Sequence, residues 1–575
     1  MNRPTPAIVT ELAARRLPRW VLLLLGLAYV LPGLLGREPW RNADLASFGV
    51  MLDMARHGGQ GAGNWWQPQL LGQAPETMAW LPYWLGAGAI RLLPGLPADL
   101  AVRLPSVALL GLTLACTWYA MLHLARLPTA QPVPFAFGGE AHPMDYARAL
   151  ADAALLALVA CLGLALLSHE STPAAAQLAC SALLLYACAR LASAHAERLW
   201  FSALVWWLGT VGLALSGGPW LGLVLGAGWL VWAAASGTVG QLGRQRWAVW
   251  AFCATGTLVA AALAWQLELP RRLDTWGQLE AWLHGPSWRK YGELLLWFTW
   301  PAGPLALWTL WRWRQRWRNG HLLLPLWFVL VALLSAWLLM ASDRALLMAL
   351  PGLACLAAFA LPTLRRSVTA LVDWFALLFF SACALFIWVY WLAMQTGVPA
   401  KPAARVASLA PGFDHVFQPW LFAWAALGTA IWLVLVAWRL GRHRPALWKT
   451  LVLSASGSTL SWLLLMTLWL PLLNHGMGQA PISQRIARQV PAGSCVLVHG
   501  LSQAQRTGLW YHGQLVLQDL ATTTPTDAQR CLALVVEPRA YASLAQHLDL
   551  AHWTLHSEIP RLREDRDRLL LFLRR

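Results

Sequence analysis

Apolar stretches of about 20 residues recur along most of this chain, and each is long enough to cross a bilayer as a helix. No other feature restricts the fold as strongly. The 575 residues are 58% hydrophobic, with a mean hydropathy of +0.50. Only 12% are charged, whereas about a quarter are charged in soluble proteins. The sequence therefore predicts an all-α polytopic membrane protein.

Hydropathy predicts about 13 membrane-spanning helices. They cover roughly residues 19–36, 99–122, 146–168, 173–190, 199–216, 217–236, 247–268, 292–311, 322–341, 344–363, 369–395, 416–438 and 450–473. With the N-terminus inside, the arginine clusters between spans all fall on the inner side, as the positive-inside rule requires. Counting the apolar segment Met78–Pro94 as a further span would place those arginines outside. We therefore expect it to form an amphipathic helix along the membrane surface.

The remaining polar sequence lies mainly in a first outer loop, residues 37–98, and in the C-terminal tail. Along the tail, helix-like and strand-like segments alternate, which predicts a small α/β domain outside the membrane. We expect a transmembrane domain over 1–477 and this extracytoplasmic domain over 478–575. Cys495 and Cys531 fall in two predicted strands. An oxidising compartment would permit a disulfide, but two buried free thiols are the favoured interpretation.

The net charge of +17 does not indicate a nucleic-acid-binding protein. The arginines cluster in short loops between spans, where they set the topology. The nine cysteines lie mostly within spans and lack the spacing of a metal site. No nucleic-acid partner and no metal ligands are expected from these patterns.

Ionisable side chains near a membrane are costly, so those that are retained are candidate functional groups. The acids near the outer ends of spans are Glu38, Asp44, Asp53, Glu76, Glu170 and Asp343. Asp44 begins an amphipathic segment, where a helix N-cap is the alternative to a functional role. Glu170 lies in the short turn SHESTP, and a helix N-terminal region explains its charge equally well. His169 is a ligand, a proton carrier or a solvated turn residue, and the last is favoured.

The cations expected on the outer side are Arg37, Arg41, Arg56, Arg91, Arg103, Lys290 and Arg344. Arginine suits bidentate recognition of phosphate. Arg344 stands at a span boundary, where it would bind phosphate, pair with Asp343 or extend its charged head to the membrane surface.

Four motifs in and near the first outer loop resemble a known family. They are PWRNADLASFG at 39–49, GNWWQPQLLG at 63–72, PYW at 82–84 and AVRLPS at 101–106, and HESTP at 169–173 matches a further acidic motif. The chain resembles the bacterial PMT-type polyprenyl-phosphate-sugar glycosyltransferases of family 39, including those that modify lipid A. It departs from them at Leu45, where the family has a second acid, and at two turns, 77–80 and 216–219, that lack the family's lysines.

The resemblance implies a C-superfamily glycosyltransferase fold and inverting transfer of a sugar from a polyprenyl-phosphate donor. The acceptor would be a lipid A-like lipid or another glycan or molecule at the outer leaflet of the inner membrane. Asp44 would be the base and Glu170 would orient the acceptor or Asp44. The resemblance places Arg103, Lys290, Arg344, Tyr83, Trp84 and His169 at the substrate. It names no cofactor and leaves a divalent cation open.

Two alternatives to transfer remain at this point. A catalytically degenerate relative would bind a lipid-linked sugar without turnover, and the missing lysines favour it. A transporter is disfavoured, because the sequence shows neither an inverted repeat nor polar residues in the middle of spans.

Overall fold

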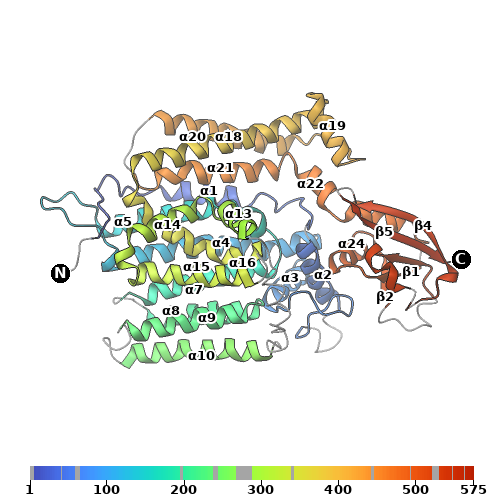
Figure 1. Ribbon diagram of the computed structural model, residues 1–575, viewed down its shortest axis with the longest axis horizontal. Helices are drawn as coiled ribbons and strands as arrows, with labels where there is room; N and C mark the ends of the chain where they lie inside the picture. The colour runs from blue at the N-terminus through green and yellow to red at the C-terminus, as the bar shows by residue number, and fades with distance from the viewer. Residues whose placement is uncertain are drawn as a thin grey trace.

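The computed structural model describes residues 5–40, 42–57, 65–193, 198–236, 244–266, 288–338, 342–441, 446–491, 494–520, 530–544, 546, 548–561 and 564–574. In this part of the chain, long helices run side by side in one bundle (Figure 1). A small β-sheet lies beyond one end of the bundle, and two helices of the first loop, 37–98, lie between the bundle and the sheet (Figure 1).

Each predicted span contains a helix or consecutive helices in its described part, and residues 267–268 and 339–341 lie outside the described residues. The bundle contains α1 (Arg19–Val30), α4 (Ala98–Ala125), α5 (Pro143–Ala160), α6 (Leu164–Ser168), α7 (Pro173–Leu191), α8 (Leu199–Leu215), α9 (Pro219–Ala235), α10 (Arg244–Gln266), α13 (Trp288–Thr299), α14 (Ala302–Arg312), α15 (Gly320–Leu338), α16 (Asp343–Leu346), α17 (Leu350–Ala360), α18 (Arg366–Thr396), α20 (Pro419–Gly441), α21 (Lys449–Leu465) and α22 (Leu470–Met477). Among the described residues, seven helices are each long and apolar enough to cross a membrane, or up to eight if the bent pair α21–α22 is one span. The chain is a multi-pass membrane protein.

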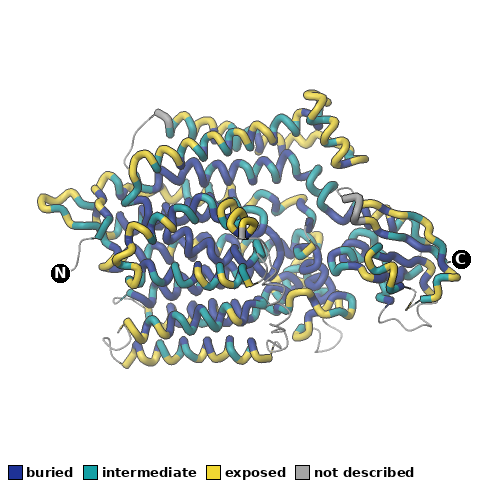
Figure 2. The backbone as a smooth tube through the Cα atoms, viewed as in Figure 1, coloured by how far each residue is buried: buried dark blue, intermediate teal, exposed yellow. Residues whose placement is uncertain are grey.

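The central helices of the bundle are largely buried, whereas the helices at its surface have many exposed residues (Figure 2). In the segment Asp343–Thr363, 94% of the most apolar 18-residue stretch is buried inside the protein. In α20 the corresponding share is 17%. The exposed side chains of the outer helices are themselves apolar, as Leu385 and Trp424 illustrate. Because such a surface is unfavourable in water, these helices face lipid.

The first loop folds into two short helices over one end of the bundle. Helix α2 covers Asn42–His57 and α3 covers Leu81–Leu92. Phe48, Met51 and Tyr83 are buried in a common core between them. Helix α3 has only 12 residues, too few for a span of about 20. The segment predicted as a surface helix is thus a short helix that packs on α2 and α4.

The C-terminal tail forms a mixed five-stranded sheet in the order β2-β1-β3-β5-β4. Its elements are α23 (Ala480–Gln489), β1 (Cys495–His499), α24 (Gln503–Tyr511), β2 (Val516–Asp519), β3 (Ala533–Val536), α26 (Tyr541–Leu544), β4 (Trp553–Arg561) and β5 (Glu564–Arg574). β1 pairs in parallel with β2 and β3, and β5 pairs antiparallel with β3 and β4. The sequence did not predict β2, which has only four residues.

The expectation of free thiols in this domain was wrong. Cys495 and Cys531 form a disulfide, with their Cα atoms 4.6 Å apart. They lie together because β1 and β3 are neighbours in the sheet, with Val496 opposite Ala533. This pairing depends on strand order, which the spacing of the two cysteines along the chain does not reveal.

The C-terminal domain contacts the first loop through α24. The rings of Phe48 and Tyr511 meet edge to face at 4.9 Å between centroids, and the guanidinium of Arg56 lies 4.9 Å from the ring of Trp510. Gly49 allows the closest approach, because a Cβ atom there would overlap Thr507 Oγ1 and lie 2.9 Å from Leu70 Cδ1. The two helices therefore pack with their backbones unusually near each other.

Gly49→Ala is expected to destabilise this contact by about 1–3 kcal/mol, the usual cost of overpacking. Unfolding of the purified protein in detergent would measure the loss. Thr507→Ala removes both atoms of Thr507 that the new methyl group would meet. Stability should therefore recover in part in the double variant, because the contact with Leu70 remains. A double variant as unstable as Gly49→Ala alone would contradict the assignment.

Candidate active site

Asp44 lies in the first turn of α2, where it faces the bundle. It is the third residue of the helix and therefore does not cap it, contrary to the simplest expectation from sequence. Its Oδ1 accepts a hydrogen bond from Ser171 N at 2.8 Å, and its Oδ2 lies 3.3 Å from Arg37 Nη2. Asp44 is 4% exposed. Both carboxylate oxygens are thus engaged by groups outside α2.

Arg37 joins the first loop to the turn between α6 and α7. Its Nη1 donates to His169 O at 2.9 Å, while Nη2 approaches Asp44. Its guanidinium also lies 4.8 Å from the ring centroid of Trp40, and the residue is only 1% exposed. A buried arginine needs such partners, because an uncompensated charge in a protein interior is costly. Arg37 was listed from the sequence only as one of several outer cations.

Glu170 is fully buried in the turn between α6 and α7. Its Oε2 accepts from Arg344 Nη2 at 2.8 Å, and the two residues are 174 positions apart in the chain. Arg344 is the second residue of α16 and its side chain is 28% exposed. The sequence interpretations of Arg344 did not include this pair, because neither residue's neighbours along the chain indicate it.

The structure brings Asp44 and Glu170 close together. Asp44 binds the backbone of Ser171, which directly follows Glu170, and Ser171 Oγ lies 3.3 Å from Ser106 Oγ of α4. The two acids are deeply buried, whereas Arg344 is partly exposed. Among these residues, Arg344 is therefore the one whose side chain is most exposed.

His169 is buried rather than a solvated turn residue, so the favoured sequence interpretation was wrong. It is 6% exposed, and its ring nitrogens lie 2.5 Å from Ala165 O and 3.1 Å from Tyr29 O. Burial lowers the pKa of His169 to about 4. The ring therefore fixes the turn against α1 and α6 while the His169 carbonyl holds Arg37.

The other residues expected at the substrate lie in different surroundings. Arg103 is 4% exposed and donates to Asp99 Oδ2 and Leu34 O, both at 3.3 Å. Tyr83 is buried and donates to Thr77 O at 2.8 Å, while Trp84 Nε1 donates to Trp65 O at 2.7 Å. Lys290 is exposed on α13. The structure thus joins Asp44, Glu170, Arg344 and His169 in one network and places Tyr83 and Trp84 in the packing of the first loop.

Glu38 is a candidate that sequence reasoning listed but gave no role. Its backbone N–H donates to Asn474 Oδ1 at 3.1 Å, which ties it to α22. Its Oε2 is buried and has no hydrogen-bond partner in the part of the chain that the structure describes. Burial, together with repulsion from Asp99, raises the pKa of Glu38 from 4.5 to about 7, although Arg103 opposes the shift. Its position directly before Pro39-Trp40 was the only sequence signal.

The raised pKa of Glu38 predicts a pH dependence of stability. Between about pH 4.5 and 7 the folded protein binds more protons than the unfolded chain, so the stability from this group falls as the pH rises through that window. Glu38→Gln should remove this part of the pH dependence. Thermal unfolding in detergent at about pH 5 and pH 8 would measure it. An identical pH response of the wild type and Glu38→Gln would contradict the prediction.

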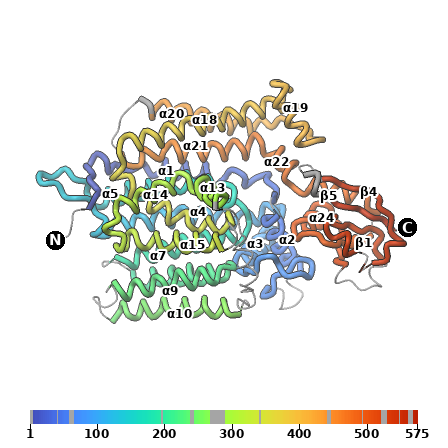
Figure 3. The backbone as a smooth tube through the Cα atoms, viewed as in Figure 1, coloured from blue at the N-terminus to red at the C-terminus, as the bar shows by residue number. Residues whose placement is uncertain are grey.

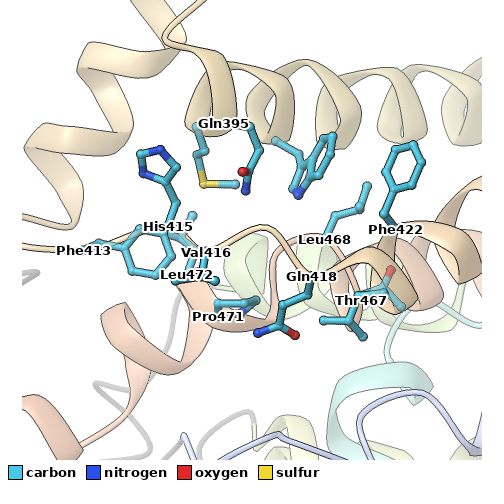
Figure 4. Close-up of a pocket in the computed structure, with 13 residues that line it drawn as sticks. Gln395, Phe413, His415, Val416, Gln418, Phe422, Thr467, Leu468, Pro471 and Leu472 are labelled. Carbon is cyan, nitrogen blue, oxygen red and sulfur yellow. The ribbon is translucent and has the colours of Figure 1, made fainter.

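Helix α22 leads from the bundle toward the C-terminal sheet (Figure 3), and a narrow cavity lies beside the break between α21 and α22 (Figure 4). Gln395 reaches into it from α18, Thr467 lines it from the break between α21 and α22, and Pro471 lines it from the first turn of α22 (Figure 4). Its volume of about 20 Å³ holds little more than one water molecule, which needs about 10–15 Å³. Asp44 and Glu170 do not line it. Within the described ranges, no three His, Cys, Asp or Glu side chains are grouped as metal ligands.

Comparison by sequence finds neither a matching protein-family model nor a matching curated protein. Comparison by structure finds ArnT from Cupriavidus metallidurans bound to undecaprenyl phosphate, with a TM-score of 0.58 and 15% identity over 96% of this chain and 98% of that chain. ArnT in the apo state gives a TM-score of 0.57 and 15% identity, covering 96% and 97%. The Archaeoglobus fulgidus oligosaccharyltransferase AglB gives 0.44 and 10%, covering 90% and 69%.

The likeness to ArnT defines the fold. The chain is a polytopic membrane protein with the fold seen in ArnT and a small α/β domain at its C-terminus. In particular, it is similar to ArnT over almost the whole length of both chains. The sequence expectation for the fold class is therefore confirmed.

Proposed function

We propose that this protein transfers a sugar from a polyprenyl-phosphate donor to an acceptor hydroxyl at the membrane surface. The observation that carries the proposal is the meeting of Asp44 with the Glu170 turn, through the 2.8 Å bond from Ser171 N to Asp44 Oδ1. The fold in which they meet is that of ArnT, whose solved structure holds undecaprenyl phosphate. A lipid-linked donor also explains why the chemistry would reside in a membrane protein.

The proposed reaction needs a base more than an acid. The acceptor oxygen attacks the anomeric carbon, the bond from that carbon to the phosphate oxygen breaks, and the phosphate leaves with the electron pair. The acceptor proton passes to Asp44, and the configuration at the anomeric carbon inverts. Phosphate is already a good leaving group, so positioning and charge stabilisation supply the rest.

Arg344 is the proposed phosphate ligand that the geometry supports best. It is partly exposed, while its partner Glu170 is not. A donor phosphate can compete for the exposed guanidinium, because arginine binds phosphate and carboxylate through the same planar set of donors. Glu170 would then be released to orient the acceptor. Arg103 and Lys290 remain proposed phosphate-binding residues. His169, Tyr83 and Trp84 would hold the surrounding loop and turn in place.

We place the protein in the bacterial inner membrane with the C-terminal domain, 478–575, on the periplasmic side of the transmembrane domain, 1–477. The distribution of arginines supports this orientation. The Cys495–Cys531 disulfide supports it independently, because disulfides persist in the periplasm and are rare in the cytosol.

A second candidate is a relative that binds a lipid-linked sugar without transferring it. The observation in its favour is that both oxygens of Asp44 are engaged in a nearly closed site. In this arrangement Arg37 and Ser171 N occupy the carboxylate oxygens that an acceptor hydroxyl would have to reach.

Transfer in nanodiscs would separate the two candidates. Purified protein would be incubated with undecaprenyl-phosphate-linked pentose or hexose and membrane lipid extracts, and the products followed by mass spectrometry. The proposal predicts a glycolipid or glycan that is heavier by one sugar, together with free undecaprenyl phosphate. Saturable donor binding without either product would support the second candidate and reject the first.

A further inference from the structure

A second cavity lies in the first loop, at the C-terminal end of α2. Its volume is about 260 Å³, far more than the roughly 10–15 Å³ that one ordered water requires. The lining side chains that matter here are polar, and they come from the end of α2 and from the segment that follows residue 64: Asp53, His57, Gln67 and Gln69. Met54, Leu71 and Gly72 complete the wall.

This cavity is separate from the network around Asp44. Asp53 lies nine residues after Asp44 in the same helix. Nine residues correspond to about 14 Å along the axis and about two and a half turns. The two carboxylates therefore project from opposite faces of α2, one toward the bundle and the other toward the rest of the first loop.

Asp53 organises the cavity wall. Its Oδ1 lies 2.6 Å from His57 Nδ1, and its Oδ2 accepts from Leu71 N at 2.7 Å. With Nδ1 as the donor to Asp53, Nε2 is the acceptor of a neutral His57 ring. The side chain of Asp53 is only 12% exposed, whereas that of His57 is 57% exposed. A nearly buried carboxylate thus holds an exposed imidazole and a backbone turn in fixed positions.

The turn that Asp53 holds is conformationally strained. Leu71 has φ of +50°, a left-handed conformation that residues other than glycine rarely adopt. Gly72, with φ of +79°, completes the turn, and Leu70 and Gln73 close it with two backbone hydrogen bonds of 2.8 and 3.0 Å. Strain of this kind persists where surrounding contacts enforce it, and it concentrates at binding sites.

We propose that this cavity binds a sugar residue of a glycan, at a site separate from Asp44 and Glu170. Two glutamine amides, an imidazole and a carboxylate offer both donors and acceptors, as a ring of hydroxyl groups requires. None of the described lining residues is arginine or lysine, so the site lacks the charges that recognise phosphate. In the orientation proposed above, the cavity faces extracytoplasmic glycans.

Binding without a donor tests this site independently of transfer. Full-length protein in nanodiscs would be applied to a printed array of bacterial surface oligosaccharides, with no lipid-linked sugar present. Wild-type protein should retain a subset of them. Gln67→Ala and Gln69→Ala, which alter exposed side chains, should each weaken binding roughly 2- to 10-fold, as loss of one or two hydrogen bonds implies. Asp53→Asn should weaken it further through His57 and the turn.

The matched control is Gln395→Ala, because Gln395 lines the narrow cavity of Figure 4 instead. It should leave oligosaccharide binding unchanged. Absence of any bound oligosaccharide, or binding that is equal in wild type, Gln67→Ala and Gln69→Ala, would overturn the proposal. Binding that depends on these residues in a protein that transfers no sugar would support the site and reject only the proposed function.

Discussion

Asp44→Asn is expected to lower the rate of sugar transfer by about 10²- to 10⁴-fold, the usual contribution of a general base. The amide keeps the shape of the carboxylate and can still accept from Ser171 N, so the turn that carries Glu170 should stay in place. The substitution removes the group that takes the acceptor's proton. It also removes the negative charge beside the buried Arg37, so some loss of stability is expected along with the loss of rate. The measurement is the initial rate of transfer in nanodiscs, with the unfolding temperature determined on the same sample.

Asp414→Asn is the matched control for that experiment. Asp414 is exposed in the segment between α19 (Ala400–Leu409) and α20, and its amide variant should transfer sugar at the wild-type rate. If Asp44→Asn also reached the wild-type rate, Asp44 would not be the base. If both variants were inactive while the wild type was active, the loss would not be specific to Asp44.

Arg37→Leu is expected to destabilise the protein by about 3–5 kcal/mol, the typical cost of removing one partner of a buried ion pair. The variant leaves Asp44 buried beside an apolar side chain, and the carbonyl of His169 loses its donor. Equilibrium unfolding or thermal inactivation in detergent would measure the effect. The site should also lose activity, because the turn that carries Glu170 would no longer be tied to the first loop.

A double variant separates charge from packing in this prediction. Arg37→Leu combined with Asp44→Asn removes both charges, so it should be more stable than Arg37→Leu alone, while remaining inactive. Equal stability of the single and double variants would mean that the pair contributes little and that Arg37 acts through His169 and Trp40.

The fold could be predicted from sequence to a large extent. Length and hydropathy locate the spans, because a helix in lipid must satisfy its own backbone and therefore needs about 20 apolar residues. The tail was recognisable as α/β, since β1 and β3 are short apolar runs. Strand order was not predictable, and with it the disulfide was missed, because Cys495 and Cys531 meet only when β1 and β3 pair.

The candidate site was predicted in part. Asp44 and Glu170 could be selected because acids beside membrane spans are expensive to retain. Their partners could not, since Arg37 and Arg344 resemble every other arginine near a span end when only their neighbours in sequence are visible. The burial of His169 and the raised pKa of Glu38 likewise depend on residues that are distant along the chain, at Tyr29 for His169 and at Asp99 for Glu38.

Helix α2 is held by contacts at two places. Arg37 and Ser171 bind Asp44 at its beginning, and α24 packs against Phe48 and Gly49. A shortened form of the chain that stopped after α22 would therefore not be a simpler version of the same protein. Truncation would expose the apolar side of the helix that carries Asp44. Loss of activity in the shortened protein would then reflect poorer positioning of Asp44, not removal of reactive groups.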